Sequence, residues 1–219
     1  MRTIMVIMCM GQLVLAHAQT FNRRYDVFGQ HLASGALSID RNGSDGFAIT
    51  ASSQYSDSTF LYRTPALLRV DPQGTVLSES KMLHPIYSIW PGYVNSADVL
   101  ADGGIVIGGS TYRPGDIQSA ALIRYGATGD SIWLREYDPG TASWIGRQAK
   151  VCKDGGFVLC GETTATGVGD GFVIKTDSNG IEQWRQTYGG PFIDYIVAID
   201  TTEDDGYFMG GEYRQNPDN

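Results

Sequence analysis

Two glutamates, Glu162 and Glu212, stand at matching places in consecutive repeats of the chain, each directly after a glycine. Matching positions on neighbouring structural units could bring the two carboxylates to one rim. A carboxylate pair is what glycoside hydrolysis uses. The competing interpretation is that each glutamate pairs with a nearby cation, such as Lys175 for Glu162. Carboxyl groups more than about 10 Å apart would exclude the hydrolase.

Aromatic residues are concentrated in the segments that connect the repeats. Exposed rings in such loops stack on sugars or peptides, whereas buried rings pack one unit against the next. We take these residues as candidates for a binding surface: Trp90, Tyr93, Trp144, Phe192 and Tyr195.

The sequence predicts no metal site, no cofactor and no catalytic residue beyond the carboxylate alternative. Asp177-Ser178-Asn179-Gly180 opens like a calcium loop, but position 12 of that loop is Tyr188, which cannot chelate as a glutamate does. A plain hairpin turn is therefore expected. Cys152 and Cys160 flank a turn. A two-residue turn would place them on opposite faces and block a disulfide, whereas a bulged turn would change that parity.

A repeat of roughly 50 residues must position these side chains. Each copy has a turn glycine, followed five residues later by a small residue. The turn glycines are Gly46, Gly104, Gly156 and Gly206, and the small residues are Ala51, Gly109, Gly161 and Gly211. A missing side chain at the second place would let an aromatic ring of an adjacent unit approach the backbone.

Each repeat divides into two β-hairpins, and the inner strands are apolar in succession, as in Phe157-Val158-Leu159. A strand that is apolar on both faces is buried on both faces. Radially stacked blades provide a neighbour on each side. The sequence thus predicts an all-β, propeller-like array of four-stranded antiparallel blades, with about three and a half blades in units at 30–84, 85–138, 139–189 and 190–219.

Residues 1–18 read as a signal peptide, with Arg2, an apolar run from Ile4 to Leu15, and the cleavage site Ala16-His17-Ala18. The propeller then occupies 19–219, and we expect a secreted or cell-surface protein. Three and a half blades do not close a ring, so we expect either further repeats of a longer chain or a second chain.

The net charge of −8 is spread along the chain without a cationic cluster. Nucleic acid binders need clustered cations, so we expect no nucleic acid partner. No segment after residue 18 is long and apolar enough to cross a membrane.

The stretches Asp154-Gly-Gly-Phe-Val-Leu-Cys-Gly-Glu-Thr, Gly171-Phe-Val-Ile-Lys-Thr-Asp-Ser-Asn-Gly and Gln183-Trp-Arg-Gln-Thr-Tyr-Gly-Gly carry a family resemblance. They resemble the propeller repeats of exported Bacteroidetes-type proteins, many of which end in a type IX secretion sorting domain. The resemblance covers about residues 40 to 213. It implies a propeller fold and export, and says little about activity.

A second resemblance concerns Thr128-Gly129-Asp130-Ser131-Ile132-Trp133 and Asn179-Gly180-Ile181-Glu182-Gln183-Trp184. These are similar to the end of the tryptophan-docking motif of quinoprotein propellers, of which only the turn and the tryptophan are kept. We therefore expect a non-catalytic binding or scaffold module for a carbohydrate or protein ligand. The alternative is a carbohydrate-active hydrolase or lyase, and more remotely a quinoprotein-like enzyme.

Overall fold

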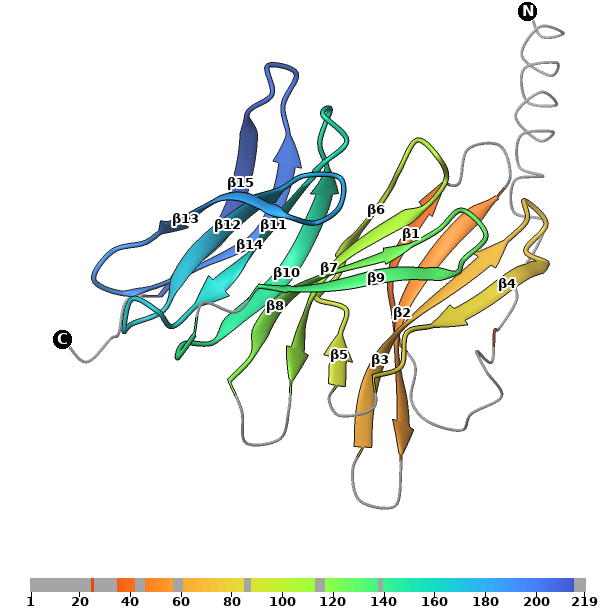
Figure 1. The fold of residues 1–219 in the computed structure, drawn as a ribbon, viewed down its shortest axis with the longest axis horizontal. Helices are drawn as coiled ribbons and strands as arrows, with labels where there is room; N and C mark the ends of the chain where they lie inside the picture. The colour runs from red at the N-terminus through yellow and green to blue at the C-terminus, as the bar shows by residue number, and fades with distance from the viewer. Residues whose placement is uncertain are drawn as a thin grey trace, which may run out of the picture.

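The computed structural model describes Tyr25 and residues 35–41, 46–56, 61–84, 88–112, 117–137 and 140–214. Within these ranges every regular element is a β-strand, and all strand pairs are antiparallel (Figure 1). None of the described residues forms a helix capable of crossing a membrane. The predicted signal peptide at 1–18 lies outside the described residues.

The strands form four sheets in chain order. Sheet 1 holds β1 (Gly35–Arg41), β2 (Phe47–Ser56), β3 (Leu61–Val70) and β4 (Val76–Lys81). Sheet 2 holds β5 (Ser88–Trp90), β6 (Ala97–Val99), β7 (Ile105–Tyr112), β8 (Ser119–Tyr125) and β9 (Ser131–Tyr137). Sheet 3 holds β10 (Trp144–Val151), β11 (Phe157–Thr163), β12 (Asp170–Thr176) and β13 (Glu182–Tyr188). Sheet 4 holds β14 (Ile193–Thr201) and β15 (Tyr207–Arg214).

The first strand of every sheet is irregular at one level. One extra residue bulges out of β1, β10 and β14, namely Leu37, Arg147 and Val197. In sheet 2 the pairs Trp90–Ser110 and Ala97–Ile107 leave residues 91–96 opposite only Gly108 and Gly109. This longer insertion divides the expected single strand into β5 and β6, which both pair with β7.

The sheets pack face to face in chain order. Ile105 and Ile107 of β7 lie in a core shared with sheet 1, while Val106 lies in the core shared with sheet 3. Phe157 and Leu159 of β11 face sheet 2. The other face of β11, with Val158 and Cys160, packs on Ile196 and Ile199 of β14. The inner strands are therefore buried on both faces, as their apolar runs predict.

The first hairpin of each of the last three sheets closes with a bulged turn at one end of the sheet, which we call the turn end. Gly103, Gly155 and Asp205 take positive φ there. The turn at 152–156 places Cys152 on the same face as Val158 and Cys160, so the expectation based on a two-residue turn is wrong. Both thiols are free, because four residue pairs, about 13 Å of strand, separate them.

The repeated small residue is explained by the backbone of its own sheet. A Cβ on Gly109, Gly161 or Gly211 would lie 1.9–2.1 Å from the carbonyl oxygen of Trp90, Ile145 or Tyr195. These carbonyls belong to the first strand, immediately before or beside the bulge. The expected aromatic ring from an adjacent unit is therefore not the main contact, although Phe172 of the same sheet also lies near Gly161.

Candidate functional site

A row of arginine and aromatic side chains, each in contact with the next, crosses the four sheets. We call it the arginine–aromatic ladder, and its members are Arg63, Trp90, Tyr93, Arg147, Tyr195 and Arg214. Three of the five aromatic candidates thus come together, and they contact three arginines that were not predicted as site residues.

The contacts of the ladder are those of cation–π pairs. The Cζ atom of Arg63 lies 5.8 Å from the ring centroid of Trp90, whose ring lies 5.1 Å from that of Tyr93. Arg147 Cζ lies 4.4 Å from the Tyr93 ring and 5.3 Å from the Tyr195 ring. Arg214 Cζ lies 5.2 Å from the Tyr195 ring.

The bulge of β10 and the insertion of sheet 2 place the two central side chains of the ladder, Arg147 and Tyr93. Arg147 is the extra residue of β10, and its guanidinium lies between a ring of the sheet 2 insertion and a ring of β14. The Tyr93 backbone N–H donates to the Arg147 carbonyl oxygen over 3.3 Å, which ties the insertion to the bulge. The ladder therefore depends on the residues in which the sheets differ.

The two candidate carboxylates lie beside the ladder, each in an ion pair. Arg147 Nη2 lies 2.8 Å from Glu162 Oε2, and both side chains are largely buried, at 12% and 15% exposed. Arg214 Nε lies 2.8 Å from Glu212 Oε1 in a more open pair. The hydrogen bond from Arg214 lowers the pKa of Glu212 below its ordinary value. Lys175, the partner expected for Glu162, pairs with Asp154 instead.

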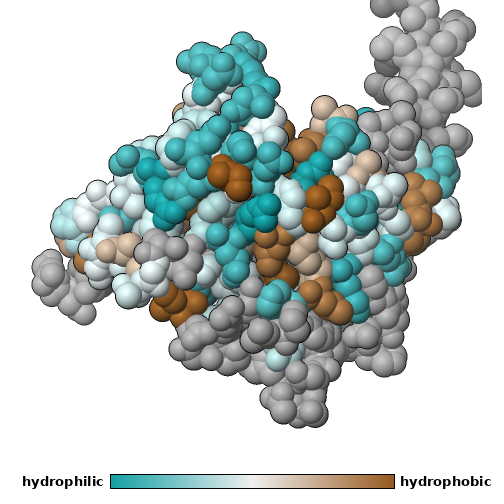
Figure 2. Space-filling view, in the orientation of Figure 1, coloured by the Kyte–Doolittle hydropathy of each residue, from teal (hydrophilic) through white to brown (hydrophobic). Residues whose placement is uncertain are grey.

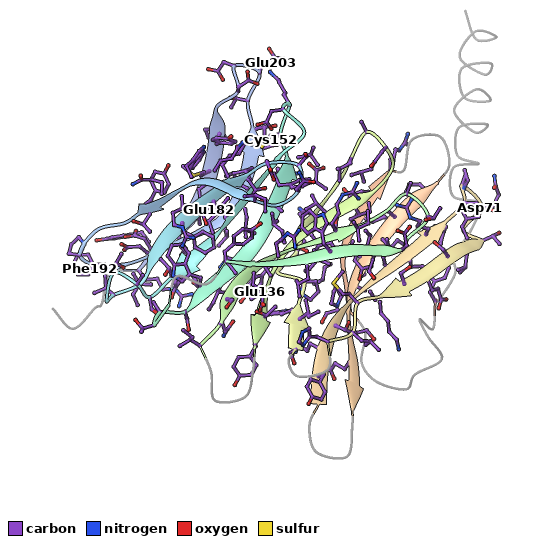
Figure 3. All side chains as sticks on the ribbon, in the orientation of Figure 1. Asp71, Glu136, Cys152, Glu182, Phe192 and Glu203 are labelled. Carbon is purple, nitrogen blue, oxygen red and sulfur yellow. The ribbon has the colours of Figure 1, made fainter. Side chains whose placement is uncertain are left out.

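The remaining aromatic candidates lie elsewhere. Trp144 is only 3% exposed and packs 4.9 Å from Phe172 in the core between sheets 2 and 3, so it belongs to no exposed surface. Phe192 is half-buried and contacts the Tyr213 ring edge-on at 5.7 Å. Figure 3 shows Phe192 far from the turn end, which carries Cys152 and Glu203.

A chain of hydrogen bonds connects the four first strands. Asn95 N donates to Leu37 O, and the Gln148 side chain donates from Nε2 to Asn95 O over 2.9 Å. Its Oε1 accepts from the backbone N–H of Ile199 over 2.6 Å. Strands β6, β10 and β14 therefore lie next to one another, with β1 beside β6.

The turn end holds buried cations at one repeated position. Arg69, Arg124 and Lys175 each stand one residue before the end of a third strand and are 4–6% exposed. Lys175 Nζ donates to Asp154 Oδ2, Thr176 O and Gln183 Oε1 at 2.7, 2.8 and 3.1 Å. Arg124 pairs with Asp102, and Arg69 donates to the Gly103 and Gly126 carbonyl oxygens. These contacts hold the turns in place.

The predicted hairpin turn at Asp177 forms, since the Asp177 carboxylate accepts from the N–H groups of Asn179 and Ile181. Gly180 supplies the positive φ. Within the described ranges, no group of three or more His, Cys, Asp or Glu side chains is placed to hold a metal ion.

On the face seen in Figure 2, apolar residues form separate patches among hydrophilic ones. A comparison of the chain with known protein families finds no match, and neither does a search of the curated proteins.

Proposed function

We propose that this protein is an exported, non-catalytic binding module of the β-propeller type, and that its ligand contacts the arginine–aromatic ladder. The propeller is supported by sheets that pack face to face in chain order with their first strands adjacent. Export is supported by the features of residues 1–18, and the resemblance to Bacteroidetes-type repeats supports both.

The observation that carries the proposal is the continuous row of three guanidinium groups and three aromatic rings across separate sheets. Tyr93 is 41% exposed and the Arg214 side chain 58% exposed, so both reach solvent. Guanidinium groups bind carboxylates in a bidentate manner, and tyrosine offers a flat apolar surface with a polar tip. A saccharide that carries carboxylates fits both properties.

An enzyme that uses Glu162 and Glu212 is less well supported. A general acid needs a raised pKa at neutral pH, whereas Arg214 lowers the pKa of Glu212. Glu162 is held by Arg147 in an ion pair whose two side chains are both largely buried. Both carboxylates therefore serve to orient the arginines of the ladder.

Calorimetric titration with hexuronic acid oligosaccharides, and with neutral hexose oligosaccharides of equal length, tests the proposal. We expect the acidic series to bind more tightly, and Tyr93→Ala or Tyr195→Ala to weaken binding by about tenfold or more. The matched control is Tyr112→Ala, because Tyr112 is 38% exposed and outside the ladder. Absence of binding to both series, or equal losses in all three variants, would contradict a saccharide ligand at the ladder.

Export has its own measurement. The mature protein should begin at Gln19 when it is recovered from the cell exterior, which N-terminal sequencing would establish. Recovery of a protein that retains residues 1–18 inside the cell would contradict export. It would leave the proposal of a ligand at the ladder unaffected.

A further inference from the structure

The three arginines of the ladder differ in how their charges are balanced. Arg147 and Arg214 each form an ion pair with a glutamate, Glu162 and Glu212 respectively. Arg63 has no ion-pair partner among the residues that the structure describes. The described part of the ladder therefore has one uncompensated positive charge, and this charge lies at the sheet 1 end.

One edge of the Arg214 guanidinium is already occupied by a carboxylate. Arg214 Nε lies 2.8 Å from Glu212 Oε1, and Arg214 Nη2 lies 3.2 Å from Glu212 Oε2. This is the bidentate arrangement in which a guanidinium binds a carboxylate. A ligand carboxylate would have to displace Glu212 to bind at this edge.

Arg147 is closed to a ligand carboxylate by burial. Its side chain is 12% exposed, and its Nη2 donates to Glu162 Oε2 over 2.8 Å. Its Nε is buried and has no hydrogen-bond partner in the described part of the chain. The guanidinium contacts the rings of both Tyr93 and Tyr195. Arg147 is therefore a positioning residue, which acts through these two tyrosines.

Arg63, in contrast, is exposed to solvent while its backbone is fixed. It lies in β3, and its backbone N–H donates to Ser88 Oγ over 3.0 Å. Ser88 is buried and begins β5, the strand that ends at Trp90. Arg63 Cζ lies over the Trp90 ring, 5.8 Å from its centroid. A guanidinium stacked on an indole keeps the N–H groups at its edge available for a carboxylate.

We propose that the ladder binds its acidic saccharide in one direction, with a terminal carboxylate on Arg63 and the neutral part of the ligand on Tyr93 and Tyr195. This inference rests on the proposed function, because it concerns the same site. Trp90 contacts both Arg63 and Tyr93, so a sugar whose carboxylate reaches Arg63 has its ring beside Trp90. The ligand class is a saccharide with a hexuronic acid at one end, and Arg63 determines the specificity for it.

Calorimetric titration of the full chain with oligosaccharides of equal length tests the direction of binding. One oligosaccharide consists of hexuronic acids, and the others are neutral hexoses with a single hexuronic acid at either end or at the centre. We expect one of the two terminal isomers to bind within about threefold of the fully acidic oligosaccharide. The central isomer should bind at least about tenfold more weakly than that terminal isomer.

Variants of Arg63 test the assignment of the carboxylate. Arg63→Gln should weaken binding of the terminal isomer by at least about tenfold, because hydrogen bonds to charged groups contribute more than those between neutral groups. The affinity for a wholly neutral hexose oligosaccharide should change by less than about twofold. Arg63→Lys keeps the charge but not the planar fork, and should retain part of the preference for the acidic ligand.

Two other arginines provide matched controls. Arg135 is also exposed and lies 5.5 Å from a tryptophan ring, that of Trp133, outside the ladder. Arg135→Gln should therefore leave the affinity for every oligosaccharide unchanged. Arg214→Ala should weaken binding of acidic and neutral oligosaccharides by the same factor, because Arg214 acts through the Tyr195 ring.

The inference is overturned if Arg63→Gln keeps the preference for the acidic ligand. It is also overturned if Arg214→Ala removes that preference, because the carboxylate would then bind in place of Glu212. Equal binding of the terminal and central isomers would exclude a single direction. In each of these cases, binding that Tyr93→Ala weakens leaves the proposed function intact, whereas absence of binding to all the oligosaccharides would contradict both proposals.

Discussion

The turn end and the bulge level of the sheets join neighbours in different ways. At the turn end the same solution recurs, because Arg69, Arg124 and Lys175 occupy one position and hold the turns. At the bulge level the matching positions hold Leu37, Arg147, Val197 or the insertion in 91–96. Positions that hold the same kind of residue in every sheet therefore serve to build the sheets. Positions that differ from sheet to sheet are the ones available for binding a ligand.

The glycine opposite each bulge tests this difference most directly, because it recurs in sheets 2, 3 and 4 although the residues of the bulges differ. Gly161→Val would place a Cβ 1.9 Å from the Ile145 carbonyl oxygen, and we expect a loss of about 3 kcal/mol in the free energy of unfolding. Gly210→Val is the control, because nothing lies within 4 Å of its Cβ position. Urea denaturation measures both, and equal losses would contradict a packing role for Gly161.

At the turn end, Asp154→Asn should cost roughly 1 kcal/mol at pH 7, since Asp154 is half-exposed and its pair with Lys175 is screened. Lys175 lowers the pKa of the Asp154 carboxyl in the folded protein. The contribution of the charge is therefore complete above the unfolded pKa, near 4, and is lost as the pH falls through the lower folded pKa.

Thermal unfolding of both proteins across pH 2 to 8 measures this prediction. The difference between them should stay constant above about pH 5 and shrink below about pH 4. A difference that grows on acidification would mean that the Asp154 pair is not what holds the turn.

The smallest effect on stability is expected at the exposed end of the ladder. Arg214→Ala should leave the free energy of unfolding almost unchanged, because Arg214 and Glu212 are both more than half exposed and water screens their pair. The same variant should weaken binding of an acidic saccharide, as measured by calorimetry. A large loss of stability would mean that Arg214 stabilises the fold rather than serving only to bind a ligand.

Much of the fold follows from local sequence. The apolar runs of β7, β11 and β12 require neighbours on both faces, and the Asp-Gly turns fix where hairpins close. The division of the sheet 2 edge into β5 and β6 was not predictable from the sequence. No residue type indicates that the six residues 91–96 lie opposite only Gly108 and Gly109. The side of the sheet on which Cys152 lies likewise depends on the bulged turn.

The sequence indicated the aromatic residues of the candidate site but not its arginines. Trp90, Tyr93 and Tyr195 come from three separate segments, and aromatic content alone singled them out. Arg147 looks like an ordinary strand residue, and only the bulge in β10 brings it between two rings. Trp144 has the same composition signal but starts a strand that is covered by sheet 2, so its ring is buried.

The side-chain amide of Gln148 has a consequence for how the sheets respond to force. One end of this amide donates to Asn95 O and the other accepts from Ile199 N, so sheets 2, 3 and 4 share a single rigid, directional connector. We expect a displacement of β14 along its axis to be felt at residues 91–96, which carry Tyr93, through these two hydrogen bonds. A load on sheet 4 should then alter the geometry of the ladder.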